Sequence, residues 1–277
     1  MTEGSVSLFR CPLCGAPLSV MSGACKCPSG HSFDIAKEGY VNLLPANRKH
    51  SREPGDDAGM ALARREFLSG GSYAPLAGAL AELCVELAPE NAVVIDSGCG
   101  EGYYTARIFA ALQSAGISAR AAGVDLSRPS VKRAAKLCRD AEFAIASVYH
   151  LPLSDKCADI LVNCFSPLAI DEFRRVIRSG GYYIYVVPAA GHLWELKQVL
   201  YDSPYPNAEE NILYDGFEYD RVVPVTFSML LEQQALANLF RMTPYYWKTP
   251  QAGAEKLAQL DKLKITADFR IHVFRRK

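Results

Sequence analysis

The chain has 277 residues, enough for one large or two ordinary domains, and its 49% hydrophobic content is sufficient for a real core. Its net charge is zero, which excludes the global positive charge typical of many nucleic-acid-binding proteins. No stretch approaches the ~20 apolar residues that span a bilayer, and the N-terminus lacks a signal-peptide pattern, so we expect a cytoplasmic protein with no membrane association.

Nine cysteines, an odd number in a chain expected to be cytoplasmic, argue against a disulfide framework and favour metal binding where they cluster. Cys11 and Cys14 can direct both thiolates at one centre from a single tight turn. Cys27 and His31 have ordinary zinc-knuckle spacing, whereas Cys25 and Cys27 on one strand would point in opposite directions. We therefore predict one zinc ion per chain held by Cys11, Cys14, Cys27 and His31, with Cys25 as the alternative ligand.

This zinc is predicted to be structural rather than catalytic, because four protein ligands leave no position open for water. A module of some 45 residues has a small core, so the metal should supply much of its folding energy. The five remaining cysteines are scattered in helical or strand patterns and are predicted to be small buried apolar residues: Cys84, Cys99, Cys138, Cys157 and Cys164.

Residues 31–45 are predicted to be a strand-rich segment that closes an N-terminal zinc-binding module over residues 1–50. Residues 1–52 carry six Lys/Arg against three Asp/Glu, and Arg48, Lys49 and Arg52 form a basic run. That run is interpreted either as phosphate contacts to a nucleic acid or as a solvated edge. Helical periodicity over 58–69 and 75–88 predicts a helical linker region, residues 51–90, that packs on the rest.

Strands and helices then alternate, which predicts a mostly parallel sheet within a third region, residues 91–277. The expected strands lie near 92–96, 120–125, 142–146, 158–163 and 182–187, with helices near 103–115, 128–139, 168–178 and 191–201. Gly180-Gly181 is predicted to be a turn before a strand. We predict a mobile loop over 203–217, and then a strand near 219–227, helices near 228–241 and 251–261, and a strand near 266–275.

A glycine loop follows the first of these strands. Gly98, Gly100 and Gly102 come after an apolar run ending in Asp96, and they permit a sharp turn with no Cβ where a cofactor must approach. The spacing differs from the G-x-G-x-x-G of dinucleotide folds. It resembles motif I of the class I S-adenosylmethionine-dependent methyltransferases, in which the loop faces the methionine end of the cofactor. The alternative is a tight strand-to-helix turn without a ligand.

Asp125 ends the second strand, where a carboxylate can accept both hydroxyl groups of a ribose. Ser127 can cap the helix that follows. The alternative for Asp125 is an acid that merely suits the N-terminal end of that helix. The glycine loop upstream favours the ribose role.

The knuckle, the glycine loop and two longer segments together resemble the RlmA-type 23S ribosomal RNA (guanine-N1)-methyltransferases. The segments are FDIAKEGYVNLL (33–44) and DSGCGEGYYT (96–105), and the likeness continues through 67–76, 146–155, 165–176, 192–197 and 242–247. The resemblance implies a Rossmann-like class I methyltransferase domain with a small N-terminal zinc-binding module. It also implies methyl transfer from S-adenosylmethionine to N1 of a guanine, a 23S ribosomal RNA hairpin as partner, and a homodimer.

Site residues follow from the same resemblance. It implies zinc ligands at Cys11, Cys14, Cys27 and His31, and cofactor contacts at Tyr73, Glu101, Gly102 and His192. It places Asp125 on the ribose and Ala146-Ser147 at the adenine edge. Asp96, Gly98 and Gly100 of motif I are also expected to bind the cofactor. Without the resemblance, Tyr73 would be interpreted as a core aromatic residue and His192 as a histidine that merely begins a helix.

Two positions depart from what methyltransferases usually carry. Ser97 stands where the family has an apolar residue, and we expect its hydroxyl to bond locally to backbone at little cost. The segment Asn163-Cys164-Phe165-Ser166-Pro167 lacks the Asn/Asp-Pro-Pro-Tyr/Phe motif that clamps an exocyclic amine, which favours a ring nitrogen as the methyl acceptor.

N1 of guanine carries a proton at neutral pH, so a general base or a path to water is expected. The sequence names no base, and the candidates are Asp159, Glu195 and His192. Two other functions stay open: a class I methyltransferase of a small metabolite, with the zinc module as a structural staple, and a zinc-bearing interaction protein that binds cofactor without turnover.

Overall fold

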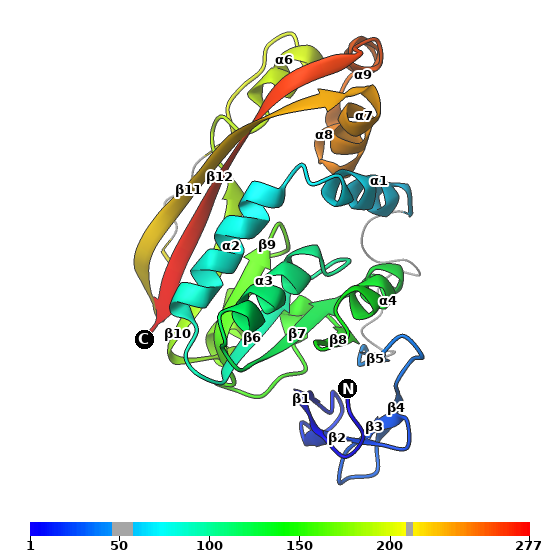
Figure 1. Ribbon diagram of the computed structural model, residues 1–277, viewed down its shortest axis with the longest axis vertical. Coiled ribbons are helices and arrows are strands. Elements are labelled where there is room, and N and C mark those ends of the chain that lie inside the picture. The colour runs from blue at the N-terminus through cyan, green and yellow to red at the C-terminus, as the bar shows by residue number, and fades with distance from the viewer. Residues whose placement is uncertain (46–57, 209–212) are drawn as a thin grey trace.

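The computed structural model describes residues 1–45, 58–208 and 213–277 (Figure 1). Two sheets organise the chain: a four-stranded antiparallel sheet of order β1-β2-β3-β4, and an eight-stranded sheet of order β11-β12-β10-β9-β6-β7-β8-β5. The predicted boundary between residues 50 and 51 lies outside the described residues, so the division into three regions stays a prediction.

The small sheet comprises β1 (Val6–Arg10), β2 (Pro17–Met21), β3 (Ala24–Lys26) and β4 (Ser32–Asp34). The next strand, β5 (Tyr40–Asn42), does not join it. Instead β5 runs parallel to β8 at the end of the large sheet, with Val41 opposite Ala144. The segment expected to close the zinc module therefore does so only through β4, while β5 ties the module to the large sheet.

The predicted alternation of strands and helices is confirmed. The parallel strands are β6 (Ala92–Ser97), β7 (Ala119–Asp125), β8 (Glu142–Ile145), β9 (Ala158–Cys164) and β10 (Ile177–Pro188). The helices before, between and after them are α1 (Ala58–Ser69), α2 (Ala74–Leu87), α3 (Tyr103–Ser114), α4 (Arg128–Leu137), the short 3₁₀ helix η2 (Val148–His150), α5 (Ile170–Val176) and, after β10, α6 (Trp194–Leu200). The C-terminal elements are β11 (Phe217–Glu232), α7 (Gln233–Met242), α8 (Tyr245–Lys248), α9 (Gln251–Ala258) and β12 (Lys262–Arg276).

Two expected boundaries are wrong. Residues 228–232 are not the start of a helix, because they continue β11 against β12 as far as the pair Glu232–Lys262, and α7 begins only at Gln233. Gly180-Gly181 lies inside β10 rather than before it. The pairing of β10 with β9 shifts register between Ile177 and Tyr182, and Gly180 there has φ of 78°, a bulge that glycine permits.

Alternate side chains of the parallel strands serve two different cores. Val94 and Ile160 pack with residues of α2 and α3 on one face of the large sheet. Ile95, Val124 and Ala144 point to the other face, where they pack with a set contributed by the small sheet: Phe9, Cys11, Leu18, Val20, Cys25 and Cys27. The zinc module and the large sheet therefore share one hydrophobic core.

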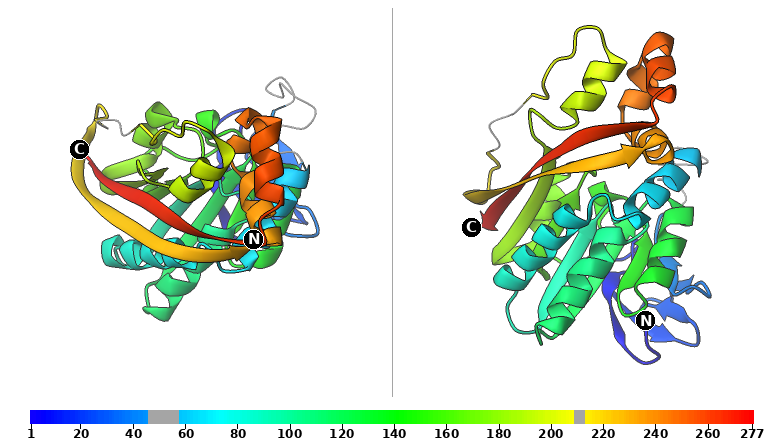
Figure 2. Two further views of the ribbon diagram at one scale, coloured as in Figure 1. Left: turned by 90° about the horizontal axis from the view of Figure 1, so that it is seen from above. Right: turned by 45° about the horizontal axis from the view of Figure 1, so that its top comes forward.

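The long β11–β12 ribbon extends past the rest of the large sheet and carries α7, α8 and α9 at its far end, opposite the N-terminal module (Figures 1 and 2). Helix α1 packs against α7. Within the described residues, no helix combines the length and apolar character needed to cross a membrane.

Candidate active site and metal centre

Most of the predicted cofactor residues lie at one edge of the large sheet. Strands β5, β8, β7, β6, β9 and β10 are parallel, so their carboxyl ends share that edge. Ser97, Asp125 and the residue pair 146–147 end or follow β6, β7 and β8, and His192 follows β10. In open α/β sheets, ligands bind outside the carboxyl ends of the strands. We call this the carboxyl edge.

The glycine loop at the carboxyl edge needs its glycines. Gly98, Gly100 and Gly102 all have positive φ, at 82°, 53° and 79°. A Cβ on Gly98 would lie 2.2 Å from the Ser166 Cβ, so the loop packs directly on the segment after β9. A Cβ on Gly100 would meet nothing within 4 Å. A Cβ on Gly102 would lie 2.9 Å from the Ala134 Cβ, so the loop is packed closely at Gly98 and Gly102 and open at Gly100.

Asp125 supports this loop as well as the helix after it. Its Oδ2 accepts a hydrogen bond from the Gly100 amide at 3.0 Å, and its Oδ1 accepts one from the Ser127 amide at 2.8 Å. Burial raises the pKa of Asp125. Ser127 caps α4 as expected, because its Oγ accepts from the Ser130 amide at 3.4 Å. Each carboxylate oxygen keeps a second lone pair with which it can accept a further donor.

Asp96 lies directly beneath the loop, 3% exposed, and accepts a hydrogen bond of 2.5 Å from Thr105 Oγ1. Burial raises its pKa from 3.8 to about 6, with the Thr105 bond opposing the rise. Because this pKa is higher in the folded state, the folded chain holds a proton between about pH 4 and pH 6 that the unfolded chain has released. The stability contributed by that proton is lost as the pH rises through about 6.

Replacing Asp96 with asparagine should abolish this dependence, since the amide does not titrate. The unfolding free energy of Asp96→Asn, relative to the parent, should rise by about 1.4 kcal/mol between about pH 5 and pH 8. Urea denaturation of the cofactor-free protein at both pH values measures the difference. The exposed Asp140, changed to asparagine, is the matched control. If the parent instead became more stable relative to Asp96→Asn at the higher pH, the raised pKa of Asp96 would be contradicted.

Glu101 of the loop is held by two arginines. Its carboxylate pairs with Arg65 of α1 at 3.1 Å and with Arg133 of α4 at 3.3 Å. Arg64, beside Arg65, is half-buried; its partial desolvation lowers its pKa, while its charge interacts favourably with the Asp125 carboxylate. Its Nη2 donates to the Met242 carbonyl at 3.3 Å. Helix α1 therefore brings positive charge to the glycine loop, which no pattern in the sequence indicated.

Tyr73 and His192 meet at Phe269 of β12. The Phe269 ring centroid lies 5.1 Å from that of Tyr73 and 4.4 Å from that of His192. Phe165 and Phe227 complete this aromatic group, at 5.5 and 6.3 Å from Phe269. Residues 73 and 192, which are 119 positions apart in the chain, are thus brought together at the carboxyl edge. Tyr73 is 3% exposed, so it also fits the alternative that it is simply an aromatic residue of the core.

His192 cannot accept a proton as it is bound here. Its Nδ1 accepts a hydrogen bond from the Asp268 amide at 3.2 Å, which leaves the proton of the neutral ring on Nε2. Burial lowers its pKa to about 4, so the ring is neutral near pH 7. His192 is therefore a hydrogen-bond donor through Nε2, and its candidacy as the general base is wrong for this geometry.

The other two candidate bases both have structural partners. Glu195 accepts from the amide and the hydroxyl of Thr266, at 2.9 and 2.7 Å, so its carboxylate fixes α6 to β12. Asp159 lies near the start of β9, away from the carboxyl edge. It accepts from the Val93 amide at 2.7 Å and pairs with Arg178.

Three further predictions concern Ser97, the pair Ala146-Ser147 and the five scattered cysteines. Ser97 Oγ is buried with no hydrogen-bond partner in the described part of the chain, so the expected local bond is absent and the cost is about 1–3 kcal/mol. Ala146 is buried and its amide donates to the Asp125 carbonyl at 3.1 Å, while Ser147 Oγ accepts from Tyr149. Four of the five scattered cysteines are buried; Cys157 is half-buried.

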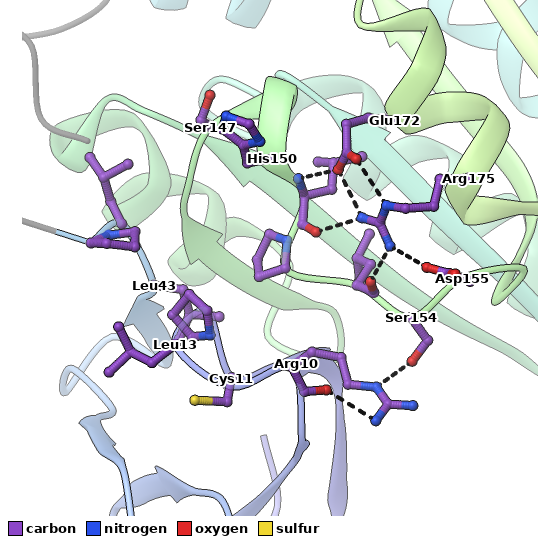
Figure 3. A pocket seen from close by; sticks show the side chains of 17 residues that line it. Arg10, Cys11, Leu13, Leu43, Ser147, His150, Ser154, Asp155, Glu172 and Arg175 are labelled. Atoms are coloured by element: carbon purple, nitrogen blue, oxygen red, sulfur yellow. Dashed lines mark hydrogen bonds and ion pairs between the residues drawn. The ribbon is translucent and has the colours of Figure 1, made fainter. Parts of the chain in front are cut away.

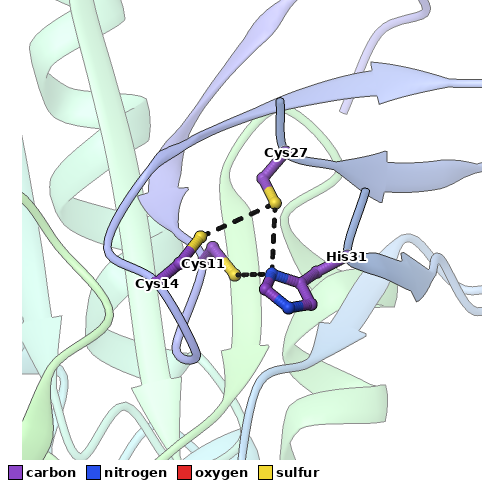
Figure 4. Close-up of side chains that lie close together, drawn as sticks. All are labelled: Cys11, Cys14, Cys27 and His31. Carbon is purple, nitrogen blue, oxygen red and sulfur yellow. Dashed lines mark hydrogen bonds between the residues drawn. The ribbon is translucent and has the colours of Figure 1, made fainter. Parts of the chain in front are cut away.

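The four predicted zinc ligands come together in the small sheet (Figure 4). Their ligand atoms all lie within 4.8 Å of one another. Cys14 Sγ lies 3.7 Å from Cys27 Sγ, and His31 Nδ1 lies 3.4 Å from the Sγ atoms of both Cys11 and Cys27. A tetrahedral zinc site places two sulfurs about 3.8 Å apart and a sulfur about 3.6 Å from a nitrogen. The donor set and its spacing fit one zinc ion with four protein ligands.

The surrounding groups favour the thiolate form at the exposed ligand. The pKa of Cys14 is lowered to about 6, first by the backbone amide of Ala16 and next by Ser29. Cys25 is excluded as the alternative ligand by its position: it is fully buried, with its Sγ 3.6 Å from the Met1 sulfur. Its burial raises the thiol pKa to about 11.

A groove of about 640 Å³ separates the zinc knuckle from η2 and α5 (Figure 3). Leu13 and Leu43 line its module side, and Ser147 and His150 line the side nearest the carboxyl edge. Arg175 in its wall is paired with Glu172 and Asp155, each at 2.8 Å. The main charged side chains of the groove wall are therefore already paired with one another.

The basic run Arg48, Lys49 and Arg52 lies outside the described residues, so its role stays a prediction. Phe269, Phe165 and Arg64 are the residues of the carboxyl edge that sequence reasoning missed. Alternation along 266–275 could place Phe269 on a buried face, but no pattern could indicate that this face meets Tyr73 and His192.

Comparisons with known proteins agree with this geometry. A family model described as "RlmA, N-terminal" matches residues 9–52, and a model described as "Methyltransferase domain" matches residues 89–239. Among solved structures, a candidate type II methyltransferase from Anaeromyxobacter dehalogenans is similar, with 18% identity, a TM-score of 0.50, and coverage of 71% of this chain and 95% of that one. At that identity the likeness supports the fold alone.

Three curated relatives are similar over nearly the whole chain, each at 34% identity. One, from Streptomyces fradiae, is named 23S rRNA (guanine(748)-N(1))-methyltransferase, with 94% of this chain and 93% of the relative covered. One from Bacillus subtilis is named as a candidate 23S rRNA (guanine-N(1)-)-methyltransferase, with 95% of both chains covered. One from Micromonospora griseorubida carries the same kind of name, with 96% and 97% covered.

Proposed function

Because the chain belongs to the family of RlmA-type 23S ribosomal RNA (guanine-N1)-methyltransferases, we propose that it transfers a methyl group from S-adenosylmethionine to N1 of a guanine in large-subunit ribosomal RNA. The observation that carries the proposal is the joining of two parts in one core: a Cys₃His zinc module and a methyltransferase sheet with its glycine loop. A small-metabolite enzyme has no evident need for the first part.

The carboxyl edge supplies the residues for cofactor binding. Asp125 would hold the ribose through the lone pairs that Gly100 and Ser127 leave free. Ala146 and Ser147 would lie along the adenine, and the Nε2–H of His192 would donate to a polar group of the cofactor or substrate. Glu101 would contact the cofactor through its backbone, because both carboxylate oxygens are paired with arginines. Bound S-adenosylmethionine supplies an activated methyl group, and these residues contribute alignment.

The zinc ligands would be Cys11, Cys14, Cys27 and His31, in a structural role. The module would grip a ribosomal RNA hairpin, whose target guanine must be looped or flipped out because pairing hides N1. A ribosomal RNA substrate also implies a cytoplasmic location. The homodimer that the family resemblance implies stays a prediction.

Mass mapping of modified guanines tests the function. Ribosomal RNA from cells lacking this protein should lose one 1-methylguanine in the large subunit, and the purified protein should restore it in vitro. Methyl transfer to a small molecule and never to RNA would establish the metabolite function instead. Deleting residues 1–55 is not a clean test, because Val41 and Leu43 are buried in the shared core.

Substituting Arg48, Lys49 and Arg52 with glutamine should flatten the salt dependence of RNA binding. Each lost phosphate contact should reduce the slope of log K against log salt by about one unit. Fluorescence anisotropy of a labelled hairpin in a salt series measures the slope. Lys156→Gln, an exposed cation at the amino end of β9, is the matched control. An unchanged slope in the triple variant would show that the run is a solvated edge.

A further inference from the structure

Phe165 has an unusual conformation for a large apolar residue. Five non-glycine residues of the described chain have positive φ, and the only large apolar ones are Phe165, at 58°, and Leu193, at 55°. Both follow strands at the carboxyl edge, β9 and β10. Leu193 is fully buried, whereas Phe165 is 49% exposed. Strained residues persist where the surroundings hold them, and they gather at functional sites.

The segment after β9 holds Phe165 in place. Asn163, fully buried, accepts from the Ser166 amide at 3.3 Å and donates through Nδ2 to the Pro167 carbonyl at 3.0 Å. Ser166 Oγ donates to the Ser97 carbonyl at the end of β6. These bonds anchor the backbone on both sides of Phe165 against the glycine loop, so the Cα from which its ring projects is fixed before any ligand arrives.

The Phe165 ring is only partly used by the protein. It contacts Phe269 at 5.5 Å and Tyr104 at 6.5 Å between ring centroids. Nearly half of the residue nevertheless stays exposed. An aromatic face that is held rigidly and left open beside a cofactor loop is suited to a flat ligand.

The strand order indicates which ligand this is. The proposed ribose and adenine contacts, Asp125 and Ala146, follow β7 and β8 on one side of β6. Phe165 follows β9, on the opposite side of β6. The cofactor nucleoside therefore extends away from Phe165, and the ring faces the side from which the methyl acceptor must approach.

We propose that the target guanine stacks on Phe165 when its N1 is presented for methylation, an inference that rests on the proposed function. A guanine extruded from RNA loses its stacking partners, and an aromatic ring replaces them. Stacking accepts any base, so Phe165 positions the guanine, and other groups must recognise it.

Phe165→Gly is the most informative variant, because glycine adopts positive φ without strain but lacks the ring. Its melting temperature should stay close to that of the parent, because the strain relieved at this φ offsets the packing lost against Phe269 and Tyr104. By contrast, kcat/KM for 23S ribosomal RNA from cells lacking this protein should fall about 10- to 100-fold. Lys156→Gly is the matched control: Lys156 has φ of 53° at the other end of β9, so its strain is also relieved, and activity should not change. Phe165→Tyr should retain most activity, whereas Phe165→Leu should not.

Calorimetry with S-adenosylmethionine separates stacking from cofactor binding. Cofactor affinity should change less than about twofold in Phe165→Gly; a loss parallel to that of kcat/KM would make Phe165 a cofactor contact and overturn the inference. Full kcat/KM in Phe165→Gly, with the parent active on ribosomal RNA, would overturn the inference alone. A parent protein that transfers no methyl group to RNA would overturn the proposed function and this inference with it.

Discussion

Cys11→Ser and Cys27→Ser are each expected to release the zinc ion and to unfold the N-terminal module. Zinc binding to small Cys/His modules is worth roughly 10–16 kcal/mol of apparent folding free energy, as much as the ~5–15 kcal/mol that holds a whole domain folded. Three pairs of ligand atoms lie 3.4 to 3.7 Å apart, the spacing of ligands around one zinc ion, so loss of a thiolate removes one corner of the site.

The loss should extend to the catalytic domain, because Phe9 and Leu18 cover the face of β6, β7 and β8 that carries Ile95 and Val124. Zinc content by elemental analysis and hydrogen exchange of β1–β4 and of β7 measure both effects, with β1–β4 losing protection first. Cys25→Ala is the matched control: it removes a buried thiol that is not a ligand, so zinc should be retained. Purified protein with no zinc, or a Cys11→Ser variant that keeps it, would contradict the assignment.

Asp125→Ala is expected to weaken S-adenosylmethionine binding by at least ~100-fold. The change removes two charge-assisted hydrogen bonds to the ribose, each worth ~1.5–3 kcal/mol. It also leaves the Gly100 and Ser127 amides without the acceptors that now fix the loop. Both effects act on cofactor binding, so we expect the cofactor affinity to fall by more than the free energy of unfolding.

Calorimetry with the cofactor measures the change, and zinc content should stay at one ion per chain. Asp140→Ala, an exposed carboxylate just beyond the other end of α4, is the matched control and should bind cofactor normally. Asp125→Asn keeps one oxygen acceptor and should lie between the two. Unchanged affinity in Asp125→Ala would mean that the carboxylate serves only the helix and the loop.

Local patterns predict the parts of this fold that local forces determine. The glycine loop, the Ser127 cap and the four zinc ligands each depend on residues close in sequence, and the structure has all three where they were expected. The start of α7 was placed too early because residues 228–232 carry helical periodicity, while their pairing with β12, some 30 residues away, decides their conformation.

Contacts between distant segments could not be predicted from one sequence. The aromatic group around Phe269 of β12 draws on Phe227 of β11 and on the residues that precede α2, follow β9 and precede α6, and the charge of Arg64 interacts with that of Asp125 from a different region of the chain. The same limit applies to the candidate bases. Glu195 and Asp159 carry suitable chemistry, but the sequence does not show that Thr266 and Val93, which lie far from them in the chain, hydrogen-bond to their carboxylates.

Because β5 belongs to the large sheet, the position of the zinc module is fixed relative to the carboxyl edge. Since β5 pairs with β8, and the Leu43 amide bonds to the Ile145 carbonyl at 2.9 Å, the zinc module is fastened within a few residues of the proposed adenine contacts. A second tie joins the Arg10 amide to the Pro152 carbonyl at 2.8 Å. The zinc module is thus held at a fixed distance from the carboxyl edge. If the module binds the RNA hairpin as proposed, only a nucleotide at that distance would reach the cofactor, so the shape of the hairpin, more than its base sequence, would determine which guanine is methylated.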